Sequence, residues 1–308
     1  MRIGIAGTGR MGTAIAKRLL MLKHEVRVWN RTPENARDAR ASGAGWSPTL
    51  RQLVNESEVV ISFLFDDAAV QGAYLGADGL LTGQVEGCLF IDMSTVSPAA
   101  HKSIAPELTL RAAAFIECPV SGSVQAARSG ALVGFVGGSA PDFTRAQPLL
   151  EQICRRVEHV GPLGAGARMK LAANLLLATF MQAVGESLLL VDATAGGAAQ
   201  AVDVLADSNI GAAILRARAS RILAALSGDT SGAVEFDLDT LRKDLVYMSQ
   251  EAATHGQSLP LASRTLECFD SASREGRGGM DIATYPAYWI HLQKAAANGQ
   301  PPAAPEAL

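Results

Sequence analysis

Short apolar runs alternate with helical periodicity over the first half of the chain. Runs with the length and alternation of strands lie at Arg2–Ala6, His24–Trp29, Glu58–Phe63, Cys88–Asp92, Ala114–Glu117, Ala131–Val136 and Arg155–His159. Helical periodicity separates most of them, first at Met11–Leu22 and then at Thr32–Ala41, where Thr32 is the expected N-cap and Pro33 the first helical residue. This order predicts an α/β fold of the Rossmann type, with a mainly parallel sheet covered on both faces.

The pattern changes at the glycine-rich segment Gly161-Pro-Leu-Gly-Ala-Gly166, after which no strand is predicted. Helices are predicted at Ala167–Ala195, Ala198–Asp207, Gly211–Leu226, Leu238–His255, Leu261–Glu275 and Tyr285–Ala297. We therefore expect two domains, a nucleotide-binding domain over residues 1–163 and an all-helical substrate and dimerisation domain over 164–297. The Pro/Ala-rich tail, 298–308, is expected to be disordered.

Composition excludes several classes of function. The 308 residues are 48% hydrophobic and have a net charge of −3 with no basic block, which argues against nucleic acid as the main partner. The four cysteines are far apart and form no CxxC, and the five histidines show no ligand spacing, so no metal site is predicted. No targeting segment precedes the first strand, and the longest unbroken apolar stretches fall short of a membrane span. We expect a soluble cytoplasmic protein.

A dinucleotide fingerprint opens the chain directly after the first predicted strand. In Gly7-Thr-Gly9-Arg-Met-Gly12, the first glycine allows a tight turn and the second lets the backbone approach a pyrophosphate. The third lets the helix pack closely on the strand, so that its first amides receive the phosphates. Cofactor contacts are therefore predicted at Gly7, Thr8, Gly9, Arg10, Met11 and Gly12. The alternative is a glycine-rich turn that binds nothing.

The end of the second predicted strand bears on the choice of cofactor. An Asp or Glu at this point would bind the ribose hydroxyls of NAD, but the chain has Asn30, Arg31 and Thr32. An arginine can pair with a 2′-phosphate, so NADP is predicted over NAD, unless Arg31 is only a solvated surface charge. Leu64, Phe65 and Thr95, in loops after later strands, are also expected to contact the cofactor. Ser97 is an ordinary helix cap or a further contact.

Two polar positions stand out in the long apolar helix predicted near the middle of the chain. Lys170 and Asn174 are four residues apart, which places both side chains on one face with Cβ atoms about 5–6 Å apart. An ammonium and an amide there can hold an oxygen-bearing group, and the lysine can exchange a proton with it. The alternative for Lys170 is a side chain that snorkels from an amphipathic helix.

A second candidate site lies upstream, near Ser121 and Gly122. The backbone amides there can cradle a carboxylate, or they can simply begin a capped helix.

Taken in order along the chain, these motifs resemble the β-hydroxyacid dehydrogenases, the family of 3-hydroxyisobutyrate dehydrogenase and the glyoxylate/succinic semialdehyde reductases. Besides the segments above, the resemblance includes Gly130, Gly137-Gly138, Phe236-Asp-Leu238, Lys243-Asp244-Leu245 and Gly278-Gly-Met-Asp281. It implies that Lys170 is the catalytic acid/base and Asn174 orients the substrate beside it. It further implies roles in substrate binding for Ser121, Gly122, Ser123, Phe236 and Asp244, and in covering the cofactor for Lys243. Ser123 stands where the family often has glycine.

The reaction implied is hydride transfer between a nicotinamide and a small β-hydroxyacid or its semialdehyde, in a homodimer or homotetramer. Two alternatives stay open. An imine reductase resembles the chain in layout and in Asn30-Arg31-Thr32, but such enzymes usually have another residue at the position of Lys170. A catalytically idle NADP-binding module would be expected to lack this lysine. From the residues alone, Lys243-Asp244 can also be a surface ion pair of little energetic weight.

Overall fold

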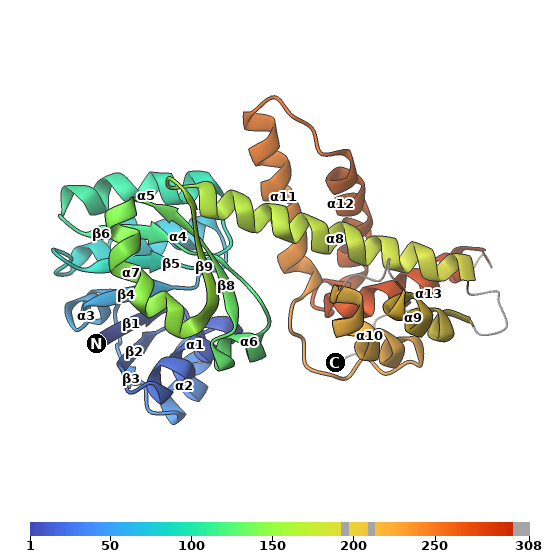
Figure 1. Cartoon of the computed structure of the whole chain (residues 1–308), viewed down its shortest axis with the longest axis horizontal. Helices are drawn as coiled ribbons and strands as arrows, with labels where there is room; N and C mark the ends of the chain where they lie inside the picture. Colours follow the sequence, from blue (N-terminus) through green and yellow to red (C-terminus); the bar gives the residue numbers. More distant parts are fainter. Residues whose placement is uncertain (192–196, 209–212, 298–308) are drawn as a thin grey trace. The chain divides into compact units, whose positions relative to one another are not determined.

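The computed structural model describes residues 1–191, 197–208 and 213–297 (Figure 1). The chain divides into two compact units, an N-terminal unit, Met1–Ala172, and a C-terminal unit, Ala173–Leu308. The predicted helical positions 192–195 and 211–212 and the predicted disordered tail lie outside the described residues. The fold class is confirmed, because a mainly parallel sheet is followed by a helical region.

One sheet of nine strands forms the centre of the N-terminal unit. The strands are β1 Arg2–Ala6, β2 Glu25–Trp29, β3 Gly45–Trp46, β4 Val59–Ser62, β5 Leu89–Asp92, β6 Ala114–Glu117, β7 Val120–Ser121, β8 Leu132–Gly138 and β9 Cys154–Gly161. Their order is β3-β2-β1-β4-β5-β6-β8-β7, with β9 paired to β8. The strands from β3 to β6 pair in parallel, whereas β8 runs antiparallel to β6 and β7. The carboxyl ends of β1, β4, β5 and β6 therefore meet at one edge.

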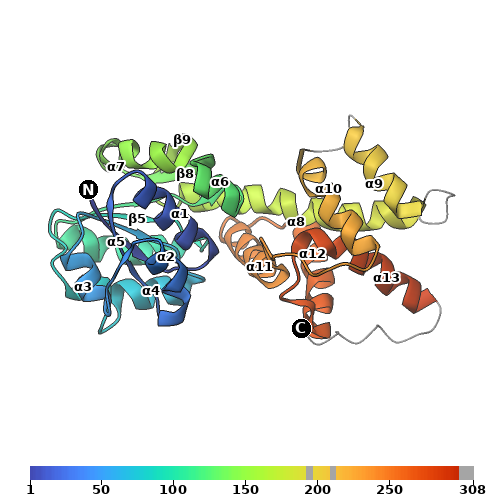
Figure 2. The ribbon, with the colours of Figure 1, turned by 90° about the horizontal axis from the view of Figure 1, so that it is seen from below.

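Helices cover both faces of this sheet (Figures 1 and 2). They are α1 Arg10–Met21, α2 Arg37–Ala41, α3 Leu50–Asn55, α4 Asp67–Leu75, α5 Pro98–Leu110, α6 Val124–Ser129 and α7 Ala140–Ile153, with 3₁₀ turns at Pro33–Ala36 and Leu80–Thr82. Apolar side chains of α1, α2, α6 and α7 pack on one face, and those of α3, α4 and α5 pack on the other. Burial on both faces explains why the central strands are continuous apolar runs rather than alternating ones.

Two local predictions need correction. Thr32 precedes a 3₁₀ turn, Pro33–Ala36, and its side chain makes no capping hydrogen bond, so the helix proper begins only at Arg37. The strands β3 and β7 were not predicted, because two residues are too few to show a period. The second of these strands matters for the site, since it contains Ser121.

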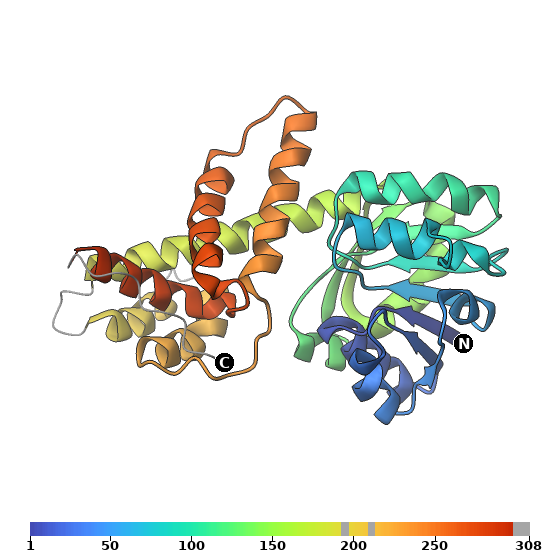
Figure 3. The same ribbon diagram turned by 180° about the vertical axis from the view of Figure 1, so that it is seen from behind.

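In the described residues of the C-terminal unit, helices joined by loops are the regular elements, and an isolated bridge pairs Asp237 with Asp281. Its helices are the larger part of α8 Ala165–Val191, then α9 Gly197–Asp207, α10 Ala213–Leu226, α11 Leu238–Thr254, α12 Pro260–Ala272 and α13 Tyr285–Ala297. The helices α11 and α12 lie side by side (Figure 3). The helix predicted over Leu261–Glu275 ends earlier, because the chain continues as a π turn, Ser273–Arg277, in which Gly276 has a φ of 78°. A 3₁₀ turn, Ile282–Thr284, leads into α13.

By length and composition, α8 would be able to cross a membrane. Core helices of soluble proteins meet the same criterion, so this is weak evidence for a membrane. Two polar side chains of α8 are buried and have partners elsewhere in the C-terminal unit. Asn174 donates to Asp244, and Gln182 accepts from the hydroxyl of Tyr285 at 2.7 Å. A helix that buries such groups in hydrogen bonds behaves as part of a protein core.

Candidate active site

The glycine fingerprint forms a tight turn between β1 and α1. Gly7 has a φ of 101°, and a Cβ there would lie 2.1 Å from the carbonyl oxygen of Phe63. A Cβ on Gly12 would lie 2.0 Å from the carbonyl oxygen of Gly7, so neither position admits a side chain. The space above Gly9 is open, because no heavy atom beyond its chain neighbours lies within 4 Å of the position of a Cβ. Of the three glycines, Gly9 therefore leaves room for a ligand at the backbone.

The residues around the turn fit a phosphate-bearing cofactor. Gly9 is the N-cap of α1, so the first amides of this helix face the open side without a side-chain cap. The hydroxyl oxygen of Thr8 is buried and has no hydrogen-bond partner among the described residues. Arg10 is exposed and Met11 half-buried at the first turn of the helix. An anion at this helix end would satisfy the amides and give the Thr8 hydroxyl an acceptor.

The end of β2 is fixed by Asn30. Its Oδ1 accepts from the backbone N–H of Thr8 at 2.9 Å, and its Nδ2 donates to the carbonyl oxygen of Thr32 at 2.8 Å. The amide is therefore held in one orientation within the loop, and one of its two N–H groups is engaged there. Arg31 and Thr32 are exposed, and no acidic side chain stands at positions 30–32.

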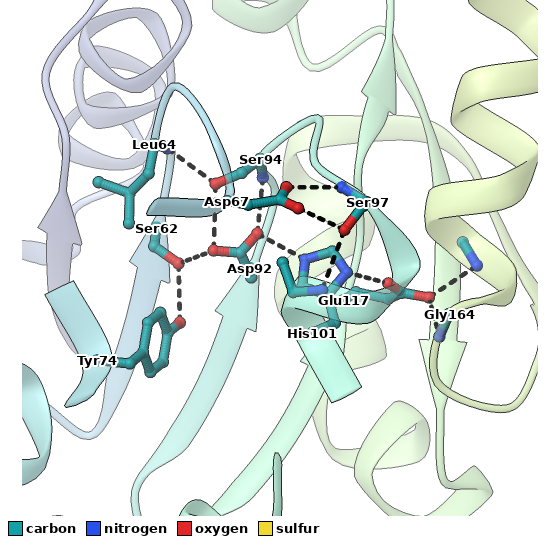
Figure 4. A network of polar contacts seen from close by, with 12 residues as sticks. Ser62, Leu64, Asp67, Tyr74, Asp92, Ser94, Ser97, His101, Glu117 and Gly164 are labelled. Atoms are coloured by element: carbon teal, nitrogen blue, oxygen red, sulfur yellow. Dashed lines mark hydrogen bonds and ion pairs between the residues drawn. The ribbon is translucent and has the colours of Figure 1, made fainter. Parts of the chain in front are cut away.

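Hydrogen bonds connect two loops at the carboxyl edge of the sheet (Figure 4). The backbone N–H of Leu64 donates to the hydroxyl of Ser94 at 2.8 Å. The side chain of Asp67 accepts from both the N–H and the hydroxyl of Ser97, at 2.9 and 2.5 Å. The hydroxyl oxygen of Ser97 also caps α5. Of the predicted cofactor contacts in these loops, Phe65 is 59% exposed, whereas Leu64 and Thr95 are half-buried.

The predicted carboxylate cradle lies at the turn between β7 and α6. Ser121 is half-buried and pairs with Val133 of β8, and Gly122 is exposed with a φ of 140°. The hydroxyl of Ser123 accepts from the N–H of Ala126 at 3.2 Å and is the N-cap of α6. Ser123 is thus the residue that caps the helix. Ser121 and Gly122 precede the helix, in a backbone turn that is exposed at Gly122.

Sequence reasoning missed a buried polar network at the same edge of the sheet (Figure 4). His101 of α5 bridges two carboxylates, with its Nε2 2.9 Å from an oxygen of Asp92 and its Nδ1 in an ion pair with Glu117. All three side chains are fully buried. Burial lowers the pKa of His101, but the hydrogen bonds and charges of Asp92 and Glu117 outweigh it and raise this pKa to about 10. His101 is therefore an imidazolium near neutral pH.

The predicted catalytic pair lies on α8. Lys170 is half-buried, and Asn174 follows one turn later within the same unbroken helix. In the C-terminal unit, Asn174 donates from Nδ2 to Oδ2 of Asp244 at 2.6 Å. Oδ1 of Asp244 is 3.1 Å from the ammonium of Lys243. The Asp244 side chain is fully buried, and the Lys243 side chain is only 15% exposed. The two residues therefore form a buried ion pair, and the alternative interpretation as a surface ion pair is wrong.

Phe236 lies just before α11 in a segment fixed by Asp281. The backbone N–H groups of Glu235 and Phe236 donate to Oδ2 of Asp281, at 2.6 and 3.2 Å. The Phe236 ring is half-buried.

The predicted site residues are divided between the two units. Asn174, Lys243 and Asp244 belong to the C-terminal unit, and the glycine turn, the carboxylate cradle and Lys170 belong to the N-terminal unit. Over the described ranges, no group of three or more His, Cys, Asp or Glu is placed to hold a metal ion.

Comparison with known proteins extends over nearly the whole chain. A family model described as the NAD binding domain of 6-phosphogluconate dehydrogenase matches residues 2–161. A second, described as NAD-binding of NADP-dependent 3-hydroxyisobutyrate dehydrogenase, matches residues 164–288. Both models describe binding of a nicotinamide dinucleotide, in agreement with the geometry of the glycine turn.

Individual relatives point to the same group. The 3-hydroxyisobutyrate dehydrogenase of Pseudomonas aeruginosa is 37% identical over 188 residues, which are 61% of this chain and 63% of that protein. The NAD-dependent L-serine dehydrogenase of the same organism is 30% identical over 92% of this chain and 95% of its own length. A solved Mycobacterium tuberculosis 3-hydroxyisobutyrate dehydrogenase with L-serine has a TM-score of 0.82 at 25% identity and covers 96% of this chain and 99% of its own.

The family assignment inferred from the order of the motifs is thereby confirmed. The glycine turn, the helix that follows it and the family matches agree on the cofactor class. The chain belongs to the β-hydroxyacid dehydrogenase family and binds NAD(P).

Proposed function

We propose that this protein transfers hydride between NADP and a small β-hydroxyacid or its semialdehyde, with Lys170 as the acid/base. The observation that carries the proposal is the position of Lys170 on α8, one turn before an asparagine whose amide is held by a buried carboxylate. Because Nδ2 of Asn174 is committed to Asp244, the orientation of its amide is fixed. A fixed amide beside an ammonium can hold one substrate oxygen in a single orientation.

In this mechanism, the bound nicotinamide supplies or accepts the hydride. During reduction, the Lys170 ammonium donates a hydrogen bond to the carbonyl oxygen and passes a proton to it as the alcohol forms. During oxidation, neutral Lys170 accepts the hydroxyl proton. Acid/base catalysis of this kind contributes about 10²–10⁴-fold in rate. Ser121 and Gly122 would bind the substrate carboxylate through the exposed backbone of the turn after β7, and Phe236 would line the substrate pocket.

NADP is proposed over NAD because Arg31 is exposed at the end of β2, where a carboxylate would otherwise receive the ribose hydroxyls. A guanidinium there can pair with the 2′-phosphate. Lys243 would help to cover the bound cofactor. The relatives include an NAD-dependent enzyme, so the preference is a property to be measured on this chain.

We further propose a cytoplasmic homodimer or homotetramer that binds no nucleic acid. Large apolar side chains are exposed on described helices of the C-terminal unit, among them Leu176 at 72%, Leu190 at 84% and Leu261 at 75%. A second subunit would remove such side chains from water. Light scattering coupled to size exclusion measures the mass, and a monomer at micromolar concentration would contradict this assignment.

The test of the reaction is the loss of nicotinamide absorbance, with NADPH and NADH in parallel. The substrates are glyoxylate, succinic semialdehyde, tartronate semialdehyde, methylmalonate semialdehyde and a cyclic imine. We expect NADPH-dependent turnover of at least one acidic aldehyde and none of the imine. Turnover of the imine alone would favour an imine reductase. Cofactor binding without turnover of any substrate would favour an idle NADP-binding module.

A further inference from the structure

The buried network has a geometric origin in the sheet. Asp92 and Glu117 end β5 and β6 and are paired in register, so their side chains project from neighbouring strands on the same face. Two buried carboxylates on neighbouring strands need hydrogen-bond donors or a cation between them. His101 comes from the first turn of α5, the helix that connects these two strands, and it contacts both carboxylates. The ring is therefore the partner that both carboxylates share.

Glu117 extends the network to the start of α8. Its Oε1 accepts from the backbone N–H groups of Gly164 and Gly166, at 2.7 and 2.8 Å. These are the residue before α8 and the second residue within it, so the carboxylate caps the helix from another part of the fold. A negative charge at this end is also favoured by the helix dipole. The opening turn of α8 is therefore attached to the carboxyl end of β6.

Glycines make the space for this carboxylate. A Cβ on Gly137 would lie 2.1 Å from Oε1 of Glu117 and 2.9 Å from the nitrogen of Gly166. A Cβ on Gly166 would lie 2.4 Å from the carbonyl oxygen of Phe135. The helix start thus approaches β8 closely enough that neither backbone tolerates a side chain. This fixes the position of the first turn as well as its hydrogen bonds.

Asp92 extends the network in the other direction, toward the loops predicted to contact the cofactor (Figure 4). Its carboxylate accepts from the N–H of Ser94 at 3.0 Å and from the hydroxyl of Ser62 at 2.5 Å. The Ser62 hydroxyl oxygen is also 2.8 Å from the hydroxyl oxygen of Tyr74. The hydroxyl of Ser94 in turn accepts from the N–H of Leu64. One continuous set of contacts joins these loops to the start of α8.

We propose that His101 is a positioning residue, which through Glu117 holds the first turn of α8 so that Lys170 points in a fixed direction. Lys170 follows Gly166 by four residues, so it lies one turn above the anchored amide on the same face of the helix. The side-chain direction at this position follows from the placement of the turn below it. This inference rests on the catalytic role proposed for Lys170.

The test replaces His101 with glutamine, which keeps most of the volume and one hydrogen bond but loses the charge. The matched control is His159→Gln, because His159 of β9 is a histidine of the same unit whose Nε2 contacts the carbonyl oxygen of Gly138. Three quantities are measured: kcat on the best aldehyde, the Kd of NADPH, and hydrogen exchange of the amides at Gly164 and Gly166.

For His101→Gln we expect kcat to fall about 10- to 100-fold, since a displacement of about 1 Å costs as much. The Kd of NADPH should rise by a smaller factor than the factor by which kcat falls. Hydrogen exchange at the amides of Gly164 and Gly166 should quicken about tenfold, while the amides of β1 and β4 stay protected from exchange. The double variant His101→Gln, Glu117→Gln replaces one of the two facing carboxyl groups with a neutral amide. It should therefore unfold at a higher temperature than His101→Gln alone.

Two results would overturn the proposal. One is a His101→Gln protein that matches His159→Gln in kcat and in exchange at both glycine amides. The other is uniformly faster exchange across the sheet, with kcat falling only in proportion to the folded fraction, because His101 would then be a plain core residue. If the unaltered protein turns over no aldehyde, the proposed reaction fails, and the exchange data alone decide whether His101 holds the helix start.

Discussion

Buried carboxylates hold α8 in both units, but they hold different parts of it. In the N-terminal unit, Glu117 accepts from backbone N–H groups at the helix start, so it places the helix. In the C-terminal unit, Asp244 accepts from the side chain of Asn174, so it orients one amide. Two side chains on one helix, Lys170 and Asn174, for which we propose catalytic roles, can therefore depend on anchors of different kinds. Damage to the first anchor should displace Lys170, and damage to the second should misorient Asn174.

The two anchors also balance charge differently. Glu117 shares its cation with a second carboxylate, Asp92, whereas Asp244 has the ammonium of Lys243 directly beside it. Removal of Asp244 therefore leaves a mostly buried ammonium without this partner. Removal of the charge on His101 leaves the buried side chains of Asp92 and Glu117 without the cation that both contact.

The largest effect on stability is expected for Asp244→Ala. Loss of a fully buried carboxylate that holds an ammonium and an amide should lower the free energy of unfolding by about 3–5 kcal/mol. Asp270→Ala is the control, since Asp270 pairs with Arg242 at 3.1 Å on the surface and should cost at most about 1 kcal/mol. Denaturant unfolding measures both. Equal losses would show that Asp244 anchors nothing.

The next effect concerns pH. Because the folded pKa of His101, about 10, lies above its ordinary value of 6.5, its contribution to stability is complete below pH 6.5 and disappears as the pH rises toward 10. The slope within this window is at most about 1.4 kcal/mol per pH unit. Denaturant unfolding from pH 6 to 10 should show the decline in the unaltered protein and a flatter profile in His101→Gln. Parallel profiles would mean that Asp92 and Glu117 do not hold a protonated ring.

A smaller effect separates cofactor binding from folding. Gly9→Ala adds a methyl group to open space, so the free energy of unfolding should change little, but the methyl would occupy the approach of the pyrophosphate. The Kd of NADPH should rise about tenfold or more, equal to about 1.4 kcal/mol. Gly72→Ala, in α4, adds a methyl to open space away from the turn and should leave the Kd unchanged. An unchanged Kd in Gly9→Ala would remove the phosphate site from this turn.

The smallest effect is expected for Arg31→Ala, which changes neither anchor. If Arg31 pairs with the 2′-phosphate, the KM for NADPH should rise about three- to tenfold while that for NADH stays the same. The rise should shrink at high salt, because the contact is exposed. Equal changes for both cofactors would contradict the NADP preference.

Much of the fold follows from the sequence for clear reasons. Long apolar runs with helical or strand periodicity predicted β1, β4, β5 and most helices, because burial on one or two faces dictates the pattern. The dinucleotide turn was equally readable, since its glycines have local steric causes at Gly7 and Gly12. The two-residue strands and the π turn after α12 gave no such signal.

The buried anchors were only partly predictable. Asp244 was found through the resemblance of its motif, although its burial was not. Asp92, His101 and Glu117 are separated along the chain and come together only through the register of β5 and β6 and the helix between them. One signal was available in principle: Asp92 and Glu117 both end predicted apolar strands, where an ionised side chain needs a partner.

The proton exchange proposed for Lys170 is tested most directly by the single-turnover rate of NADPH oxidation with a saturating acidic aldehyde. Lys170→Ala is compared with Lys170→Arg, which keeps the positive charge but does not give up a proton near neutral pH. We predict that both variants bind NADPH and that both lose about 10²–10⁴-fold in rate. A rate in either variant within a few-fold of the unaltered protein would contradict the assignment of Lys170 as the acid/base.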